Sequence, residues 1–479
     1  MLDEETENQV NAPAFDREVD VLVIGGGVAG LAAAITASEL DADVVLIEKL
    51  DRLGGSASWS AGNLLELNGP EALDHLVALS FGRTPVEVLA AYREGLSGLR
   101  TCLTEHGAHV TDVDPRLLPN CWPNSPGADG VVYYAVDGGT HGAGAALVDA
   151  LTAVVTHRGI PVSLRTSLVE LITDEGRVVG AQVKDAAGST QRIAARRGVV
   201  LATGGFENSP ELTAAYLPIE PVFPVGSPGS TGDGLRAAAQ VGAALWHMSV
   251  FYGFWALRRP EASGAYPLLL LHPGHLIVDP DGRRFHAETG REAHDALRSL
   301  GDFLPARPNR PGLPAYAIFD RALLGFGPLC RFSAPGREPW SADNSTEVER
   351  GWIHAASNVD ELAGAIGVDA ERLAETVAAY NDAARAGLDP EFGRPAASML
   401  PVDPSQLFAV ELWPGVATTS GGPQRDAAAR VISSDGSPIP GLFAAGGTGG
   451  VWGHLTEHGG GLTDGLVFGA IAARTAVSR

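Results

Sequence analysis

The segment at residues 19–49, VDVLVIGGGVAGLAAAITASELDADVVLIEK, constrains the fold of this chain more than any other feature. An apolar run at residues 21–24 leads into glycines at positions 25, 27 and 30, in G-x-G-x-x-G spacing. An alanine-rich stretch of helical character follows, and a second apolar run ends at Glu48. This order of strand, glycine-rich turn, helix and strand predicts the first βαβ unit of a dinucleotide-binding domain.

Each glycine of this turn has its own predicted role. Gly25 permits the tight turn, Gly27 lets the backbone approach a pyrophosphate, and Gly30 lets the helix pack closely on the strand. The free N–H groups at the start of the helix favour phosphate oxygens. Glu48 follows Gly30 by eighteen residues, where a carboxylate would accept both hydroxyls of an adenosine ribose. The alternative is a glycine-rich turn that holds no ligand.

The composition is that of a globular chain with a strong excess of acidic residues. The chain has 479 residues, 45% of them hydrophobic, and this length allows about three domains. Its formal net charge of −23 argues against nucleic acid or an anionic membrane as partner, because both attract a positive surface. The longest mostly apolar stretch, residues 243–257, is shorter than the roughly 18 to 20 residues of a bilayer span, so no membrane-spanning helix is expected.

The N-terminus and the cysteines both predict a cytoplasmic protein. Residues 1–16 are acidic and polar, which predicts a short disordered lead rather than a secretion signal. Cys102, Cys121 and Cys330 lie far apart and form no metal-binding or haem-binding spacing. We therefore expect free thiols in a reducing compartment, and no metal site.

The chain then alternates between helical and sheet-forming stretches. A second glycine-rich block at residues 53–63 would let the backbone run beside a flat ring system. Helical patterns follow at about residues 70–105 and again before Gly159. Strands separated by polar turns then lead into a buried strand at residues 198–202, which extends the first sheet.

The pattern changes from Phe254 onward, where prolines, arginines and short elements become common. Helical periodicity dominates residues 358–385, and an apolar strand at residues 441–445 then runs into a glycine loop and a final helix. This return to a strand, loop and helix predicts an insertion inside a discontinuous cofactor domain. The predicted division is a lead at residues 1–16, a cofactor domain at residues 17–256 and 413–479, and an inserted domain at residues 257–412.

In its motifs and their spacing, the chain resembles the flavoproteins grouped with fumarate reductase and 3-ketosteroid Δ1-dehydrogenase. The resemblance extends from about Val19 to Ala473. Besides the first glycine unit with Glu48, it rests on GGSASWSAG (54–62), VVLATGGFENSPEL (199–212), SPGSTGDGLRAAAQVGA (227–243), HLIVDPDGRRFHAE (275–288), DELAGAIGVDAERLAETVAAYN (360–381), TSGGPQRD (419–426) and GLFAAGGTGG (441–450).

This resemblance implies an α/β fold with a discontinuous Rossmann-like FAD-binding domain and an inserted α+β capping domain that buries the substrate against the flavin. In covalent fumarate reductases a histidine of the second glycine block carries the flavin. Ser56 stands at that position, so noncovalent FAD is expected. The predicted FAD contacts are Gly25, Gly27, Val28, Ala29, Gly30, Glu48, Lys49, Gly54, Gly55, Ser56, Ser60, Ala61, Gly62, Ala202, Thr203, Gly204, Asp233, Gly446, Gly447, Gly461, Leu462 and Thr463.

The residues that distinguish the subfamilies leave the substrate open. Fumarate reductases hold a dicarboxylate with a histidine before T-x-G-G, where Thr418 stands, and with an arginine before the last helix. Ketosteroid dehydrogenases usually place a tyrosine followed by Pro-Gly near that helix, where this chain has Thr456, Glu457 and His458. Glu457 or His458 could replace the tyrosine as acid–base group or carbonyl donor. The alternative is an ion pair outside the flavin pocket, which is favoured more for Glu457.

Arg291 is a second candidate for proton transfer. Allowing one gap, it falls where fumarate reductases carry the arginine that passes the proton. An arginine relays a proton only beside carboxylates, and Glu288 and Glu292 are its sequence neighbours. A surface salt bridge is the alternative.

Two further features bear on the predicted pocket. The N–H groups of residues 459–462, at the start of the last helix, would cradle an oxyanion or a flavin carbonyl, although a simple helix cap is the alternative. Most of the aromatic residues near the cofactor loops are expected in the core, and a few lining the pocket would suit an apolar ring. They are Tyr133, Tyr134, Trp246, Phe251, Tyr252, Trp255 and Trp452.

The sequence thus predicts an FAD-dependent dehydrogenase or reductase that acts on a CH–CH bond beside a carbonyl, with desaturation of a cyclic ketone favoured. One alternative is fumarate-reductase-like reduction of an unsaturated carboxylate. Another is a flavin-binding redox sensor without catalysis. A small-molecule substrate and a separate electron donor or acceptor are expected, since no haem or iron–sulfur motif is present. The sequence specifies neither the substrate, the direction of reaction nor the oligomeric state.

Overall fold

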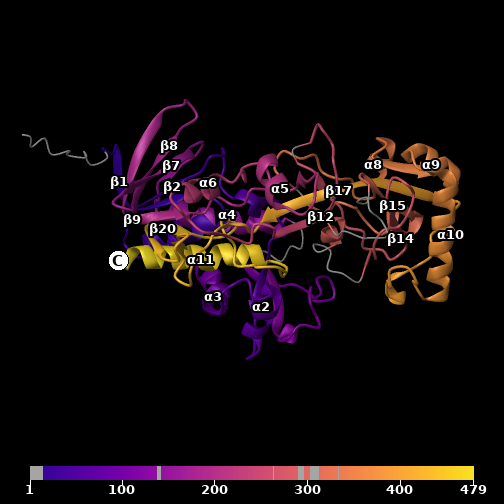
Figure 1. Ribbon diagram of the computed structural model, residues 1–479, viewed down its shortest axis with the longest axis horizontal. Coiled ribbons are helices and arrows are strands. Elements are labelled where there is room, and N and C mark those ends of the chain that lie inside the picture. The colour runs from indigo at the N-terminus through magenta and orange to yellow at the C-terminus, as the bar shows by residue number, and fades with distance from the viewer. Residues whose placement is uncertain are drawn as a thin grey trace, which may run out of the picture.

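The computed structural model describes residues 14–136, 142–262, 264–289, 296–301, 312–332 and 334–478. The molecule is elongated, with one lobe built around a mostly parallel sheet and a second around a mainly antiparallel sheet (Figure 1). Strands β12 (Phe251–Leu257) and β17 (Leu407–Thr419) cross the middle of the molecule between the lobes.

The first lobe contains an eight-stranded sheet in the order β19-β20-β9-β1-β2-β6, to which β8 and β7 are added beside β9. Its strands are β1 (Arg17–Ile24), β2 (Val44–Ile47), β6 (Val162–Ser163), β7 (Ser167–Asp174), β8 (Arg177–Lys184), β9 (Thr190–Leu201), β19 (Arg430–Ile432) and β20 (Pro438–Ala444). Its helices are α1 (Val28–Glu39), α2 (Ala72–Ser80), α3 (Val86–Glu105), α4 (Ala143–His157), α5 (Pro210–Tyr216), α6 (Asp233–Gln240) and α11 (Gly460–Val477). β9 pairs in parallel with β1 and with β20, so the last strand completes the sheet that the first begins. This confirms the discontinuous α/β fold.

Alternate residues of β1 enter two separate cores. Val21 and Val23 pack with α1, α4 and α11 on one face of the sheet. Leu22 and Ile24 pack with α6 and β8 on the other face. Because both faces of the sheet are covered here, residues 21–24 of β1 are all apolar and form a continuous apolar run in the sequence.

The second lobe is organised around β17, which pairs with β12, β15, β16 and β10. Its other strands are β10 (Phe223–Pro224), β13 (Tyr266–Pro267), β14 (His275–Val278), β15 (Ala315–Asp320) and β16 (Ile353–Ala356). Its helices are η3 (Ala296–Gly301), α7 (Arg321–Leu324), α8 (Ser345–Glu349), α9 (Val359–Ile366), α10 (Ala370–Ala386) and η4 (Ala396–Ser398). Two small sheets complete the fold, formed by β3 (Asn63–Leu67), β5 (Val131–Val136) and β4 (Val110–Asp112), and by β11 (Leu245–Trp246) and β18 (Gly422–Pro423). Two short 3₁₀ helices, η1 (Gly55–Trp59) and η2 (Ala128–Gly130), lie in loops of the first lobe.

Two helical stretches that the sequence predicts are each divided into two helices. Residues 70–105 form α2 and α3, because Phe81 takes a left-handed φ of 54° after α2 and Pro85 precedes α3. Residues 358–385 form α9 and α10, which are separated at Gly367 with a φ of 72°. Asp369 then caps α10, because its side chain accepts the N–H of Arg372.

The predicted domain boundaries fall inside strands. The boundary after residue 256 lies in β12 and the boundary after residue 412 lies in β17, and these two strands pair with each other. The division into domains therefore stays a prediction. Of the predicted N-terminal lead, residues 1–13 lie outside the described part of the chain.

Candidate active site

The first glycine turn has the geometry that a bound pyrophosphate requires. Gly25 has a φ of +105°, and a Cβ there would lie 2.3 Å from the carbonyl oxygen of Ala202. A Cβ on Gly30 would lie 1.8 Å from the oxygen of Gly25, whereas at Gly27 the nearest atom is 3.9 Å away. Packing thus demands glycine at two positions, and the third leaves open space. Among the described residues no side chain caps α1, so the N–H groups of Val28 and its neighbours face this space.

Glu48 lies directly after β2 and is 6% exposed. Its Oε2 accepts the N–H of Gly26 at 2.7 Å and its Oε1 accepts the N–H of Leu50 at 2.8 Å. Each carboxylate oxygen has a second lone pair, so the group can still accept the hydroxyls of a ribose. The residues present therefore fit the adenosine end of FAD.

Lys49 and Asp233 form an ion pair at the neighbouring edge of the sheet. Nζ of Lys49 lies 2.8 Å from Oδ2 of Asp233 and donates to Oγ1 of Thr231 at 2.6 Å. Asp233 is the first residue of α6, so this pair joins the end of β2 to the start of α6. Both residues are predicted FAD contacts, and Lys49 directly follows Glu48 in the chain.

The second glycine block runs alongside the first. The N–H of Gly54 donates to the oxygen of Gly26 at 2.8 Å, and Gly54 has a φ of +118° before Gly55 begins η1. Oγ of Ser56 lies 3.4 Å from Oγ of Ser230 and accepts the N–H of Ser227 at 3.4 Å. The turn that contains Ser60, Ala61 and Gly62 is closed by a hydrogen bond from the N–H of Gly62 to Oγ of Ser60, at 3.1 Å.

The remaining predicted FAD contacts converge on the same edge of the sheet. Ala202, Thr203 and Gly204 follow β9, and Gly446 and Gly447 follow β20. These loops touch, because Oγ1 of Thr448 donates to the oxygen of Gly204 at 3.0 Å. In a parallel sheet the carboxyl ends of neighbouring strands meet at the edge where ligands bind.

The start of α11 completes this edge. Its N-cap, Gly459, has a φ of 75°, and no side chain in the described part of the chain caps the helix. A Cβ on Gly461 would meet nothing within 4 Å, so space is open beside the first turn. Thr463 forms a hydrogen bond with Tyr92, with its Oγ1 at 2.6 Å from the tyrosine hydroxyl oxygen. The N–H groups of Gly461 and Leu462 can therefore face a negatively charged oxygen.

His458 lies next to this helix end and contacts two tyrosines. Its Nδ1 is 3.2 Å from the hydroxyl oxygen of Tyr252 on β12. Its ring also packs edge-on against Tyr133, with centroids 5.5 Å apart. Tyr252 pairs with Thr418 in the β12–β17 ladder, so both side chains project from the same face. Thr418, the position that distinguishes the fumarate reductases, thus lies opposite the tyrosine that contacts His458.

Glu457 lies on the same loop but points into a buried site of its own. It is 1% exposed, its Oε2 accepts the hydroxyl of Tyr133 at 2.5 Å, and its Oε1 lies 3.1 Å from Nε2 of His75. The alternative for Glu457, an ion pair on the loop outside the flavin pocket, stays a prediction, and its contact with His75 is fully buried. His75 is on α2, and nothing in its local sequence indicates this role.

Arg291 lies outside the described residues, but its predicted neighbour Glu288 can be placed. Oε1 of Glu288 accepts from Arg284 at 2.8 Å, and Oε2 accepts from Arg394 at 3.0 Å. Burial alone raises the pKa of Glu288, yet the hydrogen bond and charge of Arg284, with the charge of Arg394, hold it below its ordinary value. Glu288 is therefore part of a buried ion cluster in the second lobe.

Sequence reasoning also missed Glu207, in the GGFENSPEL motif. Its carboxyl is 2% exposed, and its Oε2 accepts both the N–H and the hydroxyl of Thr419 at 3.2 Å. Burial raises the pKa of Glu207 to about 7, against opposing hydrogen bonds from Ser230 and Thr419. Glu207 thus links the loop after β9 to the T-x-G-G segment.

A buried ion pair lies behind the start of α11. Arg425 donates to Asp464, and both side chains are at most 2% exposed. The guanidinium of Arg425 also lies 4.0 Å from the centroid of the Phe468 ring. Burial raises the pKa of Asp464 to about 6 even though Arg425 opposes this shift.

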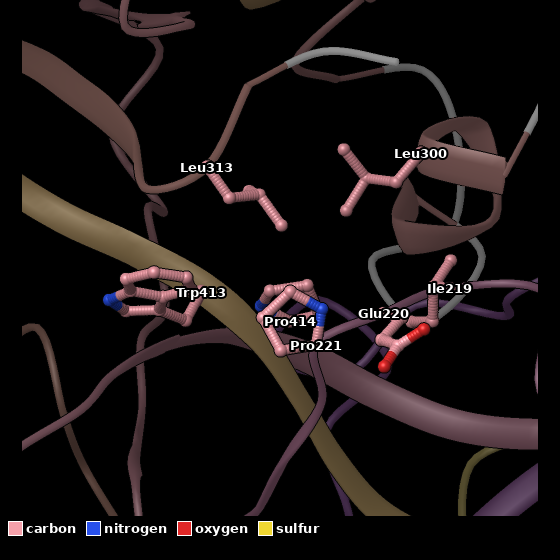
Figure 2. Close-up of a pocket in the computed structure, with 7 residues that line it drawn as sticks. All are labelled: Ile219, Glu220, Pro221, Leu300, Leu313, Trp413 and Pro414. Carbon is pink, nitrogen blue, oxygen red and sulfur yellow. The ribbon is translucent and has the colours of Figure 1, made fainter. Parts of the chain in front are cut away.

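A separate pocket of about 370 Å³ opens beside η3. Leu300 and Leu313 face Trp413 and Pro414 of β17 across it, and Ile219, Glu220 and Pro221 complete its wall (Figure 2). None of the predicted FAD contacts lines this pocket, so we do not assign it to the active site.

Comparison with known proteins identifies the family. The family described as an FAD binding domain matches residues 20–463. A 3-oxosteroid 1-dehydrogenase of Mycolicibacterium smegmatis is 27% identical over 95% of this chain and 97% of its own length. A probable fumarate reductase of Shewanella frigidimarina is 29% identical over 95% of this chain and 74% of its own. The crystal structure of 3-ketosteroid Δ1-dehydrogenase from Sterolibacterium denitrificans, 23% identical, superposes with a TM-score of 0.84 over 97% of this chain and 100% of that chain.

The chain therefore belongs to the FAD binding domain family, and FAD is its cofactor. It is an FAD-dependent oxidoreductase of the class that acts on CH–CH bonds, and the predicted resemblance to fumarate reductases and ketosteroid dehydrogenases is confirmed. The roles of the individual site residues stay predictions.

Two broader expectations can be compared with the structure. Within the described ranges, Cys102, Cys121 and Cys330 form no disulfide with one another. None of the helices in the described ranges combines the length and apolarity needed to cross a membrane. The cellular compartment stays a prediction.

Proposed function

We propose that this protein desaturates a cyclic ketone, removing one hydrogen from the carbon beside the carbonyl and one from the next carbon. The observation that carries the proposal is the hydrogen bond between Tyr252 and His458, formed opposite Thr418 and beside the start of α11. This pair can accept a proton. FAD, when bound, supplies the acceptor for the hydride.

Two proton transfers take place in this proposal, one to Tyr252 and one to His458. The C–H bond beside the carbonyl breaks and its proton goes to the hydroxyl oxygen of Tyr252, while the proton of that hydroxyl passes to Nδ1 of His458. Nδ1 must be unprotonated beforehand, so the reaction requires the neutral imidazole of His458 with its hydrogen on Nε2. The N–H groups of Gly461 and Leu462 stabilise the negative charge that develops on an oxygen at this helix end.

The neutral character of the site favours a ketone over a small dicarboxylate. A dicarboxylate needs cationic partners at both ends, and Thr418 and Tyr252 offer only hydroxyl groups. The likeness to a 3-oxosteroid dehydrogenase along almost the whole chain also supports a ring ketone.

One observation favours a second candidate, the reduction of an unsaturated carboxylate. Nη2 of Arg298 on η3 donates to the oxygen of His454 at 2.7 Å, which places a guanidinium on the loop that leads to His458. Arginine binds carboxylates well because its fork matches their geometry. For the reduction of an unsaturated carboxylate, Arg291 stays the predicted proton donor.

The test uses Tyr252→Phe and His458→Gln with cyclohexanone and a 3-oxosteroid as probes, in anaerobic stopped-flow measurements of flavin absorbance. Both variants should keep FAD and bind the ketone with little change, but reduce the flavin about 10²- to 10⁴-fold more slowly. His454→Gln is the matched control, because this histidine lies on the same loop and its ring packs against Phe81. Wild-type rates in both variants would show that Tyr252 and His458 do not transfer the proton.

A further inference from the structure

A chain of hydrogen bonds leads from the neighbourhood of His458 to the molecular surface. The hydroxyl of Tyr133 donates to Glu457 at 2.5 Å, and Glu457 lies 3.1 Å from Nε2 of His75. Nδ1 of His75 lies 2.8 Å from Oγ of Ser125. Tyr133, Glu457 and His75 are at most 4% exposed, whereas Ser125 is only half-buried. The chain thus begins beside the proposed site and ends near solvent.

The hydrogen-bond partners determine where the protons of this chain lie. The carbonyl oxygen of Pro126, 3.2 Å from Nδ1 of His75, can only accept. The hydroxyl of Ser125 donates to the oxygen of Trp122 at 2.9 Å, so its own oxygen is also an acceptor toward His75. Nδ1 of His75 therefore carries a proton.

A second proton must lie between His75 and Glu457. Nε2 and Oε1 are 3.1 Å apart, and two bare lone pairs would repel each other at this distance. The pair is therefore either an imidazolium with a carboxylate or an imidazole with a carboxylic acid. Both forms have zero net charge, which is why the pair can be buried completely.

We infer that Tyr133, Glu457 and His75 carry the proton that the ketone loses from the active site to solvent. This inference rests on the proposed function and adds the route by which the proton accepted by His458 leaves the site. The proton on His458 reaches the oxygen of Tyr133 through one bridging water, as the hydroxyl proton of Tyr133 moves to Oε2 of Glu457. The shared proton then settles on Nε2 of His75, and the proton on Nδ1 leaves by way of Ser125. No electrons move, and one proton leaves at Nδ1 of His75 for each proton that enters at the oxygen of Tyr133.

Tyr133 is suited to pass a proton without losing its own. Burial, together with the nearby Cys121 and Glu457, raises the pKa of its hydroxyl far above the ordinary value. A free phenolate is thereby disfavoured, and a proton can enter on one side only as another leaves on the other. Glu457 and His75 act through Tyr133 and are positioning residues rather than catalytic ones.

The chain offers a closely matched control for the tyrosine. Tyr134 is the next residue on β5 and is 1% exposed, and its hydroxyl forms no hydrogen bond with any described residue. Successive residues of a strand point to opposite faces, so Tyr134→Phe removes a buried hydroxyl outside the chain of hydrogen bonds. Glu457→Gln keeps the shape of the carboxyl and can still accept from Tyr133, but it cannot hold the shared proton.

The first experiment compares Tyr133→Phe, Glu457→Gln and Ser125→Ala with Tyr134→Phe, using FAD-loaded protein and cyclohexanone or a 3-oxosteroid. Tyr133→Phe and Glu457→Gln should lower the rate of ketone-dependent turnover about 10²-fold, the low end of acid–base effects, with the ketone KM almost unchanged. Added imidazole should restore most of the rate, because a soluble base replaces the lost route. Tyr134→Phe should behave as the wild type. Slow variants that imidazole does not rescue, or wild-type rates in Tyr133→Phe and Glu457→Gln, would overturn the inference.

The second measurement needs no substrate. In ¹⁵N-histidine NMR spectra of the FAD-loaded protein, the signals lost in His75→Gln identify the ring nitrogens of His75. We expect Nδ1 to be protonated in the wild type, and Glu457→Gln to shift Nε2 toward a fully unprotonated nitrogen. A neutral ring protonated only at Nε2 would overturn the relay. If no ketone reduces the flavin, the proposed function fails, and this spectrum still decides the proton positions on which the relay depends.

Discussion

Glu207 should make the stability of this protein fall as the pH rises, in contrast to the usual effect of a carboxyl held by cations. Its pKa is about 7 in the folded chain, and the ordinary value is 4.5. Below pH 4.5 the carboxyl of Glu207 is protonated in the folded and the unfolded chain, and its contribution to the free energy of unfolding is fully present. Between pH 4.5 and 7 the unfolded chain releases the proton while the folded chain retains it, so the free energy of unfolding falls.

The size of this effect follows from the two pKa values. At 1.36 kcal/mol for each pH unit, the difference between 4.5 and about 7 amounts to about 3 kcal/mol. Glu207→Gln removes the titration and keeps an acceptor for Thr419. Relative to the wild type, this variant should gain about 3 kcal/mol of unfolding free energy between pH 4.5 and pH 8.

Urea denaturation followed by tryptophan fluorescence at pH 4.5, 6 and 8 measures this gain. Glu211→Gln is the matched control, because this carboxyl lies four residues along the chain with its side chain 87% exposed. The difference between Glu211→Gln and the wild type should not change with pH. If Glu207→Gln and the wild type also differ by a constant amount at every pH, the buried carboxyl is not titrating and the reasoning is refuted.

Three further predictions concern the cofactor and the core. Acid denaturation should release intact FAD, because Ser56 cannot form the histidyl link of covalent relatives, and flavin that stays with the precipitated chain would contradict this. Glu48→Gln should weaken FAD binding roughly 10- to 100-fold, the effect of losing a charged hydrogen bond of about 1.5–3 kcal/mol. Fluorescence titration of the apoprotein measures it, and unchanged affinity would exclude Glu48 from the site. Arg425→Met should destabilise the fold by about 3–5 kcal/mol by leaving Asp464 buried and unpaired, and adding Asp464→Leu should recover most of this in urea denaturation. Equal losses in the single and double variants would show that the ion pair is not responsible.

The first βαβ unit could be predicted from sequence because its signals are local. The apolar run, the three spaced glycines and Glu48 lie within about thirty residues, and each has a separate steric or hydrogen-bonding reason. The structure places Glu48 beside Gly26, as the spacing requires. The return of the chain to the same sheet at residues 441–445 could also be predicted from the sequence, because a buried parallel strand is a continuous apolar run.

The buried chain at Glu457 was not predictable, because its members are far apart in sequence. Glu457 and His75 are separated by 382 residues, and Tyr133 lies 324 residues from Glu457. A histidine on an apolar helix face gives no local sign of its partner. The boundaries predicted at residues 256 and 412 have a similar limitation, because a change in composition does not reveal that a strand continues through it.

The most direct test of the account is the absorbance of the oxidised flavin when the purified protein is mixed anaerobically with a cyclic ketone or with succinate. We expect a 3-oxosteroid or cyclohexanone to bleach the flavin, succinate to leave it oxidised, and fumarate to leave the chemically reduced flavin unchanged. Rapid reoxidation of the reduced flavin by fumarate, with no bleaching by any ketone, would contradict the account and favour reduction of an unsaturated carboxylate.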